Sequence, residues 1–449
     1  MGRILQHRSQ PDLVRAKAGY DRAIAAVEET RRNLRVINPD AQFSLRDRIE
    51  PLYRESIDLS LRMANPDLAK IIDRVDALKL VELENFLQCQ LDRYRPVTKV
   101  AQAGGAVVFY PTILNDRLEV ILRLADGKLR RFVVPVTRQQ LETTIDRFRA
   151  SLSQPQYGWN SQAAAQLYDW LIRPAEKYLT PQPKNLVFVM DGALQNIPVA
   201  ALYDRSSQAY LVDRYPVAVT PSLEILGATA ATIDRAQILI GGLTQIASPV
   251  APTTQRGGVY QPLAHAETEV QGIKALFPRS TTLIGENFTQ ANLQRVLAGG
   301  THSIVHLATH GQFSSDPQRT FIVTAAGQTI DLDRLKSLLQ QGRSNSLTEP
   351  LQGGIDLMVL SACETATGDR RAALGLAGTA IRSGAASTLA SMWSVDDRAT
   401  AKLMKQFYGA LTRPGTSKAQ ALQFAQQSIR QEYEHPYYWA SFVLVGNWL

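Results

Sequence analysis

Hydrophobic positions in the first part of the chain recur at the spacing of helices. Apolar residues three and four apart predict a helix over residues 12–34. Asn-Pro-Asp at 38–40 and again at 65–67 interrupts the pattern, because proline cannot supply the N–H that a helix interior needs. We therefore expect two further helices between residues 44 and 92, the second with a wide apolar face.

The helix pair over residues 44–92 is comparable in length to a tetratricopeptide repeat, whose period is roughly 34 residues. No second copy with matching small residues follows it. We interpret residues 1–96 as an N-terminal helical region with at most degenerate tetratricopeptide-like helices. Cys89 falls on the last of these helices, where a small buried hydrophobe is the ordinary role of a thiol.

From about residue 100 the hydrophobic period changes to that of strands. Two strand-like runs, at 118–125 and 128–134, flank Asp126 and Gly127. Asp-Gly between two such runs is a strong signal for a β-hairpin. A helical stretch near 138–152 follows, so we interpret residues 97–156 as a segment of hairpin and helix that links the first region to the next.

The remainder of the chain alternates short apolar runs with helical patterns, which predicts an α/β fold. We expect a mostly parallel sheet with helices on both faces, over a single domain at 157–449. The expected strands are 186–190, 237–240, 304–308, 356–360 and 387–393. The expected helices lie near 160–179, 266–277, 289–297, 332–340, 375–384, 397–411 and 417–432.

Chemically active residues follow several of these strands. His310 and Gly311 come after the strand at 304–308, and Cys363 comes after the next one. Asp396 and Asp397 follow the strand at 387–393, and Asp191 follows the strand at 186–190. Because sites in parallel sheets lie beyond the carboxyl ends of the strands, we expect these side chains at one edge.

Composition excludes several classes of protein. The chain has 449 residues and two cysteines, Cys89 and Cys363, too few for a disulfide scaffold or a cysteine-rich zinc site. The net charge of +8 is spread thinly, without the basic stripe that nucleic-acid binding requires. No apolar run approaches the ~20 residues of a membrane helix, so we expect a cytoplasmic protein without nucleic-acid or membrane partners.

Three histidines spaced by four, His302, His306 and His310, raise the question of a metal site. On a strand each neighbour is about 13 Å away at ~3.3 Å per residue, which is too far to share one ion. We therefore expect no metal and no cofactor, and we interpret His306 as a core histidine. His310 differs, because it precedes a glycine at a strand end.

Cys363 and His310 together suit nucleophilic catalysis. A thiol becomes a nucleophile when a neighbouring base takes its proton, and imidazole does so near neutral pH. The backbone N–H groups of Gly311 and Cys363 are candidates for an oxyanion hole. The alternative is that Cys363 is a packing residue of the core and that His310 is a turn residue. The histidine precedes the cysteine by 53 residues, close to the ≈ 50 of caspases, although the caspase signature is absent.

The motifs around these residues resemble the CHAT domain family. They are HLATHG at 306–311, VLSACET at 359–365 and SMWSVDD at 391–397, with VMDGALQNIP at 189–198 as the first-strand motif. The resemblance spans roughly 160–449. It implies a caspase-like fold and a cysteine endopeptidase related to separase, with His310 as base and Cys363 as nucleophile. Members of the family are typical of bacteria, notably cyanobacteria, and are often switched by a partner protein.

The resemblance also implies specificity for a basic residue before the scissile bond. Asp397, Asp396 and Asp191 are the candidates for the acid of that pocket, since a carboxylate pairs an arginine bidentately. Asp396 or Asp397 could instead cap the following helix. Cleavage after Arg or Lys makes Arg370-Arg371 a candidate self-processing point.

A second hypothesis is a catalytically silent regulatory module, which uses the caspase-like fold and the N-terminal helices to bind a protein partner. Nucleotide binding is disfavoured, because neither a P-loop nor a dinucleotide fingerprint occurs in the sequence. The His310 and Cys363 pair favours the endopeptidase.

Overall fold

The structure is a computed structural model that describes residues 12–37, 46–87, 105–153, 155–223, 236–244, 263, 265–313, 320–325, 327–340, 355–365, 385–394 and 396–449. Its helices are α2 (Leu13–Ile37), α3 (Arg46–Leu61), α4 (Leu68–Leu87), α6 (Arg138–Ser153), α7 (Ser161–Leu171), α8 (Leu211–Arg214), α9 (Ala266–Leu276), α10 (Gln290–Leu297), α11 (Leu332–Gln340), α13 (Asp397–Leu411), α14 (Lys418–Arg430) and α15 (Pro436–Trp439).

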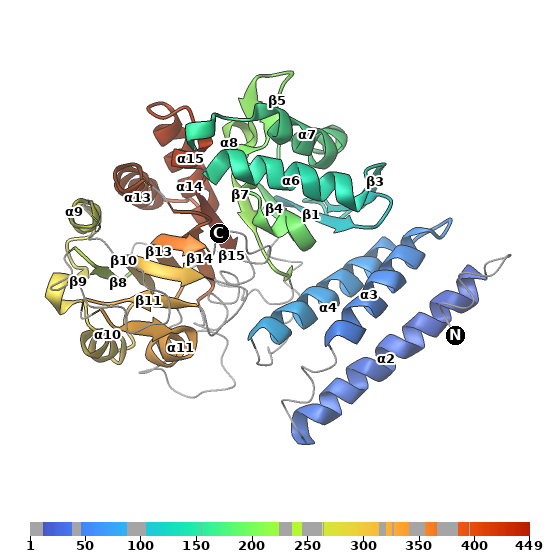
Figure 1. Ribbon diagram of the computed structural model, residues 1–449, viewed down its shortest axis with the longest axis horizontal. Helices are drawn as coiled ribbons and strands as arrows, with labels where there is room; N and C mark the ends of the chain where they lie inside the picture. Colours follow the sequence, from blue (N-terminus) through green and yellow to red (C-terminus); the bar gives the residue numbers. More distant parts are fainter. Residues whose placement is uncertain are drawn as a thin grey trace.

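One thirteen-stranded sheet runs through the described residues (Figure 1). Its order is β12-β11-β10-β13-β14-β15-β7-β4-β1-β2-β3, and β8 pairs with both β10 and β9. The strands are β1 (Ala106–Ile113), β2 (Leu118–Arg123), β3 (Leu129–Val134), β4 (Asn185–Phe188), β7 (Val217–Val219), β8 (Ile238–Gly242), β9 (Thr281–Ile284), β10 (Ile304–Phe313), β11 (Phe321–Val323), β12 (Thr329–Asp331), β13 (Leu357–Thr365), β14 (Ser387–Ser391) and β15 (Phe442–Gly446). A separate ribbon pairs β5 (Tyr203–Asp204) with β6 (Ala209–Tyr210).

The sheet consists of two halves that run in opposite directions. Strands β8, β10, β13 and β14 are parallel to one another, and so are β15, β7, β4 and β1. The two sets meet where β14 pairs antiparallel with β15. The carboxyl ends of the two halves therefore lie at opposite edges of the sheet.

Helices cover both faces of the half that contains β10. In Figure 1, α9, α13 and α14 lie on one side of these strands, and α10 and α11 lie on the other. The strand residues alternate accordingly: Ile304 joins a core with α13, whereas Val305 and Leu307 join a second core with α10 and α11. This alternation is the pattern of a parallel strand that is buried on both faces.

A buried ion pair joins α14 to the start of β13. Lys418, the first residue of α14, places its Nζ 3.1 Å from each carboxylate oxygen of Asp356. Burial is the main cause that lowers the pKa of Lys418, and the Asp356 charge opposes it. The pair therefore fixes α14 against the amino end of the strand that carries Cys363.

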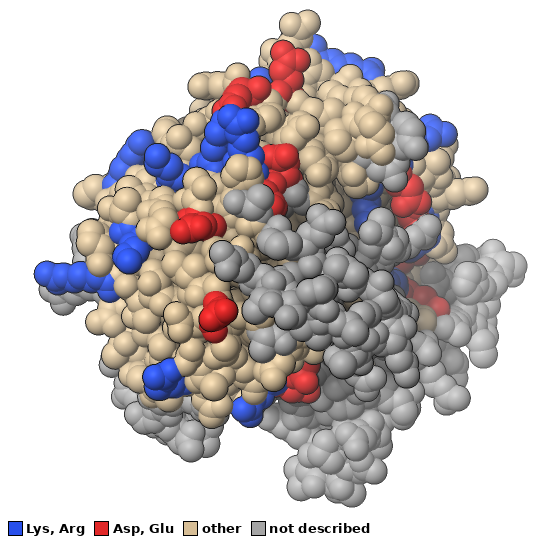
Figure 2. All heavy atoms as spheres, turned by 60° about the vertical axis from the view of Figure 1, so that its left-hand side comes forward, with Lys and Arg blue, Asp and Glu red and all other residues tan. Residues whose placement is uncertain are grey.

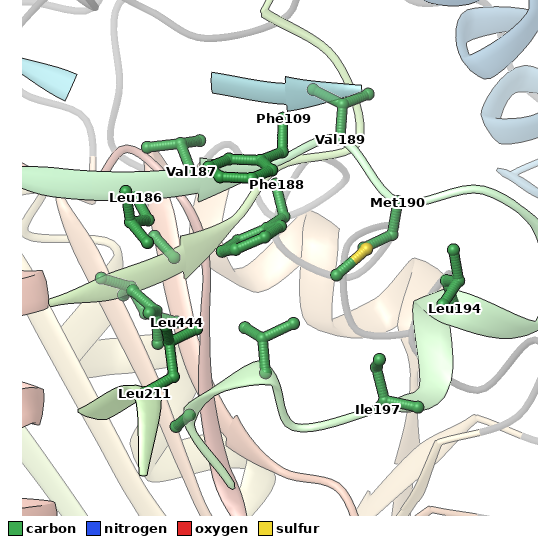
Figure 3. Close-up of a cluster of buried hydrophobic side chains, with 14 of the residues drawn as sticks. Phe109, Leu186, Val187, Phe188, Val189, Met190, Leu194, Ile197, Leu211 and Leu444 are labelled. Atoms are coloured by element: carbon green, nitrogen blue, oxygen red, sulfur yellow. The ribbon is translucent and has the colours of Figure 1, made fainter. Parts of the chain in front are cut away.

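The core of the other half forms around β4. Residues 185–188 are all buried, and Phe188 stacks on Phe109 of β1 with ring centroids 4.7 Å apart. Figure 3 shows these rings with Met190, Leu194 and Ile197 from the segment after the strand. An unbroken apolar run is the sequence pattern of such a two-sided strand, so the expectation of a buried strand here is confirmed.

The hairpin expected around Asp126 and Gly127 is present, because β2 and β3 pair antiparallel across them. Strand β1 was not expected. It contains Pro111, which argues against an interior strand. The ladder between β1 and β4 ends at Phe109, whose carbonyl accepts from the Val189 N–H, and Pro111 pairs only with Val120 of β2. Because β1 pairs with β4, the hairpin continues the main sheet.

Strands β10 and β13 are longer than the sequence predicts. Each was expected to end before its histidine or cysteine, at residues 308 and 360. Strand β10 continues because β11 pairs with its second part, and β13 continues beside it. His310 and Cys363 therefore lie within strands and not in the turns that follow them.

Charged side chains of both signs intermingle on the face shown in Figure 2. The basic residues described there alternate with acidic ones, as the spread of charge along the sequence predicts. In the described part of the chain, no helix combines the length and the apolar character that crossing a bilayer requires.

Candidate functional site

An irregularity in the strand pairing lies beside His310. Strand β10 pairs with β13 in regular register up to Ala308 and Ser361, and the register resumes at Gly311 and Cys363. Two residues of β10, Thr309 and His310, thus face one residue of β13. Such a bulge re-aims side chains and is common next to active sites. The backbone of Cys363 lies directly across the ladder from the residue after His310.

The neighbours of His310 hold this bulge in place. The Thr309 hydroxyl is fully buried and donates to the carbonyl of Val323 in β11. Gly311 pairs with Cys363 on one side and with Ile322 of β11 on the other. The His310 side chain is half-buried. The bulge is therefore anchored from two strands, and His310 stands at its end.

The structure describes the backbone of Cys363 but not its side chain. The role of the Gly311 and Cys363 N–H groups in an oxyanion hole stays a prediction. Cys89, the Arg370-Arg371 dipeptide and the helix expected near 375–384 lie outside the described residues.

Two aspartates begin α13 close to His310. Asp396 is the N-cap residue, and its Oδ1 accepts a hydrogen bond of 2.8 Å from the Ala399 N–H. The capping alternative is therefore observed for Asp396. Asp397 is the first residue of the helix and is half-buried.

The environment of Asp397 favours its neutral form. Burial is the largest cause that raises the pKa of this carboxyl, and the charges of Asp396 and Glu269 add to it. The imidazoles of His265 and His310 oppose the shift. The structure thus brings Asp397, Asp396 and His310 within electrostatic reach of one another, at the carboxyl edge of the β10 half.

Two aromatic residues, Trp393 and Tyr437, lie near Asp396 and Asp397, which we call the acidic pair. Trp393, just before the pair, donates its Nε1–H to the carbonyl of Tyr437, at 3.2 Å. The pKa of Tyr437 is raised by burial first and by Asp396 and Asp397 as well. The Tyr437 hydroxyl is therefore within electrostatic reach of the two carboxylates.

His306 is a core histidine, as the sequence predicts. Its side chain is fully buried, with Nε2 3.0 Å from Glu269 Oε1 and Nδ1 3.2 Å from the Tyr408 hydroxyl. His302 instead places its Nε2 3.1 Å from Thr281 Oγ1. The histidines spaced by four thus contact different partners.

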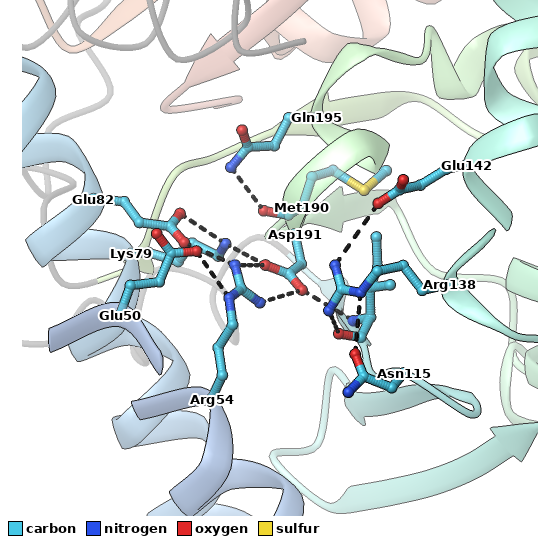
Figure 4. Close-up of polar contacts among 11 residues, drawn as sticks. Glu50, Arg54, Lys79, Glu82, Asn115, Arg138, Glu142, Met190, Asp191 and Gln195 are labelled. Atoms are coloured by element: carbon cyan, nitrogen blue, oxygen red, sulfur yellow. Dashed lines mark hydrogen bonds and ion pairs between the residues drawn. The ribbon is translucent and has the colours of Figure 1, made fainter. Parts of the chain in front are cut away.

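Asp191 belongs to an ion-pair network with the N-terminal helices, shown in Figure 4. Arg54 of α3 binds both carboxylate oxygens, at 3.0 and 3.1 Å. Lys79 of α4 binds Oδ1 at 2.7 Å, and the Ile113 N–H donates to Oδ2 at 2.9 Å. Each oxygen therefore accepts two hydrogen bonds. Glu82 accepts from both cations in turn, at 3.0 and 2.9 Å.

This network separates Asp191 from the other candidates. Burial by itself would raise the pKa of Asp191, but the charges of Arg54 and Lys79 outweigh burial and lower it. The residue also follows β4, whose direction is opposite to that of β10. Asp191 and His310 therefore lie at opposite edges of the sheet, and the expectation that all carboxyl ends share one edge is wrong.

Three residues that were not predicted from the sequence join the site. His265 is the N-cap residue of α9 and has no side-chain capping bond. Glu269 of α9 and Tyr437 of α15 interact electrostatically with Asp397. Glu269 is an acid in an otherwise apolar helix face, which is the signal that could have found it. His265 and Tyr437 are half-exposed, so they do not alter the hydrophobic periodicity of the sequence.

Comparison with curated proteins finds tetratricopeptide repeat protein 28 of Homo sapiens, 24% identical over 323 residues, and its Mus musculus counterpart, 24% identical over 325 residues. Each alignment covers 63% of this chain and 13% of the relative, so the chain spans only a small part of their length. Both are mammalian and lend no support to the expected bacterial, notably cyanobacterial, origin.

Among solved structures, two crystal structures of the Saccharomyces cerevisiae separase–securin complex are similar. Their TM-scores are 0.50 and 0.51 at 11% and 10% identity. They cover 91% and 97% of this chain, and 37% and 40% of theirs. Separase has a caspase-like fold, so the expected fold class is confirmed.

The family model of the CHAT domain matches residues 161–447. This range includes β10, β13 and α13, which carry the bulge, the cysteine and the acidic pair. It begins after β1, β2 and β3. The match extends over more than half of the chain, and the chain therefore belongs to the CHAT domain family.

Proposed function

We propose that the protein is a cysteine endopeptidase of the caspase-like type. His310 takes the proton of the Cys363 thiol, and the thiolate attacks the carbonyl carbon of the scissile peptide bond. The protonated imidazole then gives its proton to the leaving amine as the C–N bond breaks. Water, deprotonated by His310, releases the acyl group from sulfur.

The observation that carries this proposal is the pairing of β10 with β13. It sets Cys363 across from Gly311, next to the bulge that presents His310. Glycine at 311 leaves room for the close approach of a substrate backbone.

We assign the basic specificity to Asp396 and Asp397. They face the same edge as His310, and Asp397 interacts with it electrostatically. Asp191 is left out of the pocket, because its carboxylate already accepts four hydrogen bonds. A substrate with Arg or Lys before the scissile bond would place its cation on the acidic pair.

The experiment incubates the purified chain with fluorogenic peptides that end in Arg, Lys or Leu. We expect cleavage of the first two, loss of at least ~100-fold in Cys363→Ala and His310→Ala, and full activity in the matched control Cys89→Ala. A chloromethyl ketone that ends in Arg labels Cys363 without turnover. A folded protein that neither cleaves the peptides nor is labelled at Cys363 would be the catalytically silent module.

Self-processing after Arg370 or Arg371 is part of this proposal. Mass spectrometry of the incubated protein is expected to show a new C-terminus at one of these residues. The cut should disappear in Cys363→Ala. An intact wild-type chain with active peptide cleavage would exclude self-processing and leave the endopeptidase in place.

A regulatory protein partner on the N-terminal helices is the second part of the proposal. The curated relatives are named for tetratricopeptide repeats, and the separase structures contain securin. Between α2, α3 and α4 lies a cavity of about 570 Å³, with Tyr53 and Ile57 in its wall and Lys70 at its exposed rim. Its size lies within the range of ligand sites.

A photo-crosslinker placed at Lys70 tests this part in cells that express the full chain. The control position is Lys128, which is similarly exposed, at 66% against 77% for Lys70. A protein captured only from position 70 supports a partner at the cavity. Equal capture from both positions, or none from either, contradicts it.

A further inference from the structure

Strand β3 forms one end of the sheet, on the side of β1 and β2 that is away from β10 (Figure 1). Among the described strands it pairs only with β2. An edge strand leaves the N–H and C=O groups of every second residue unpaired, and these groups can hydrogen-bond to a further strand. Because β3 also precedes residues 161–447, it offers this edge outside the range that the family model matches.

The register of the hairpin shows which residues of β3 present these groups. The Leu124 N–H donates to the Lys128 carbonyl at 2.9 Å, so every second residue from Lys128 onward bonds to β2. The residues between them are Leu129, Arg131 and Val133, whose N–H and C=O groups therefore point away from β2. Val133 is 47% exposed, so the outer edge is accessible at this position.

Two exposed cations flank this edge. The Arg130 guanidinium carbon lies 5.9 Å from the centroid of the Tyr178 ring, and the Lys177 Nζ lies 5.0 Å from it. Tyr178 ends a 3₁₀ helix, η3 (Arg173–Tyr178). Arg130 also donates to the carbonyl of Leu129 at 2.9 Å. Neither cation forms an ion pair with an acid in the described part of the chain, so both are available to an anionic ligand.

The acids beside β3 do not compensate these cations, because they are occupied by others. Asp126 forms an ion pair of 2.8 Å with Lys128 in the hairpin turn. Glu119 of β2 is buried and binds Arg117 and Arg131, at 2.7 and 2.8 Å. The outer edge of β3 therefore carries an excess of positive charge.

This charge disfavours a second copy of the chain as the added strand. Antiparallel pairing centred on Arg131 would set the two Arg131 side chains directly opposite each other. Pairing centred on Leu129 would set Arg130 opposite Lys128 of the copy. Like charges in directly opposed positions destabilise a sheet, whereas opposite charges stabilise it. The edge is therefore complementary to an acidic strand.

We propose that the outer edge of β3 binds an extended, acidic segment of a partner protein, which pairs with β3 as an added strand. Main-chain hydrogen bonds to Arg131 and Val133 supply affinity, and Arg130 and Lys177 select acidic side chains. This goes beyond the endopeptidase and concerns a surface separate from the cavity between α2, α3 and α4. Lys128 adjoins this edge, so capture of one and the same protein from Lys128 and from Lys70 would contradict two separate surfaces.

The test uses two fluorescein-labelled peptide amides of seven residues, one alternating Glu and Val and the other alternating Lys and Val. Fluorescence anisotropy measures their binding to the full chain with Cys363→Ala, so that neither peptide is cleaved. We expect the acidic peptide to bind about tenfold more tightly than the basic one, since each opposed charge pair adds to the difference. Residue-resolved hydrogen exchange should show the Arg131 and Val133 N–H groups slowed by the acidic peptide, and that of Phe132 unchanged.

Two variants separate the backbone from the charge. Val133→Pro removes an outward N–H without a bond to β2, which an edge strand tolerates, and should weaken binding of the acidic peptide about tenfold. Its matched control is Val133→Thr, which keeps the N–H and should leave the affinity within about twofold. Arg130→Glu changes only an exposed side chain and should also weaken binding about tenfold. It keeps the test decisive if Val133→Pro fails to fold by circular dichroism.

Three results would overturn the proposal. Equal affinity with and without Val133→Pro would exclude pairing through the edge, and equal affinity for the two peptides would exclude the acidic chemistry. No binding of either peptide would exclude both. A dimer that is seen by analytical ultracentrifugation and abolished by Val133→Pro would make a second copy the occupant instead. None of these results depends on cleavage by Cys363.

Discussion

Asp191 and Asp397 are two acids in one sheet with opposite surroundings. Asp191 is buried and accepts four hydrogen bonds, two of them from a single guanidinium, so its charge is compensated. Asp397 is half-buried and neighbours two further acids, and among the described residues the imidazoles of His265 and His310 oppose those charges. The difference distinguishes an acid that builds the fold from one that we propose for substrate binding.

The position of each acid agrees with this difference. Asp191 lies at the edge that α3 and α4 cover, and its cations come from those helices. Asp397 lies at the opposite edge, beside the bulge that carries His310. From sequence motifs alone, both are candidates for the acid of the specificity pocket, because each follows a buried strand.

The largest expected effect comes from removing the Asp191 charge. Asp191→Leu removes two hydrogen bonds of Arg54 and one of Lys79 from the buried network and leaves Glu82 as the acid they share, which costs about 3–5 kcal/mol of unfolding free energy. Urea denaturation measures it. The pKa of Asp191 is lowered, so its contribution is full above the ordinary value of 3.8 and is lost as the pH falls below it. A change below about 1 kcal/mol would contradict the structural role.

Lys418 gives a second test of a compensated charge. Lys418→Met leaves Asp356 without its partner and should cost about 3 kcal/mol. The double variant Lys418→Met with Asp356→Leu should recover most of the loss, because neither charge then remains buried alone. Thermal unfolding of the two variants checks this, and equal destabilisation in both would show that the cost is one of packing.

An intermediate effect is expected at Asp396. Asp396→Ala removes the cap of α13 and should cost about 1 kcal/mol of stability, whereas Asp396→Asn should retain the cap. Circular dichroism during thermal unfolding compares the two. If Asn is as destabilising as Ala, the Ala399 hydrogen bond does not account for the stability of the helix.

The smallest effect has the opposite sign. Asp397→Asn should stabilise the protein at pH 7, by no more than about 0.5 kcal/mol because the group is half-exposed. A raised pKa means that the folded state disfavours the charge, so the gain appears above the folded pKa and vanishes as the pH falls through it. Differential scanning fluorimetry at pH 7 and 4 measures it. A lower melting temperature of the variant at pH 7 would show that the charge of Asp397 stabilises the fold, as the charge of Asp191 does.

Much of the β10 half could be predicted from local sequence. Buried strands read as apolar runs, and the helices between them carry clear periodicity, so β10, β13 and α13 were found with the motifs on them. The ends of β10 and β13 could not be found in this way. The extra residues of β10 pair with β11, which is three residues long and begins 8 residues after β10 ends, and the extra residues of β13 pair with those of β10.

The relative direction of the strands could not be predicted from the sequence pattern, for a different reason. Whether β14 and β15 pair parallel or antiparallel depends on contacts between residues far apart in the chain. Asp191 was therefore grouped with His310. His265 escaped notice because a half-exposed histidine before a helix breaks no periodicity.

The place of β15 between β14 and β7 has a consequence for biosynthesis. This strand joins the two halves, yet it follows every other described strand in chain order. A ribosome that adds about 5–20 residues per second exposes both halves before it supplies the strand between them. Each half must wait with an unpaired edge, which is where a chaperone would bind during synthesis.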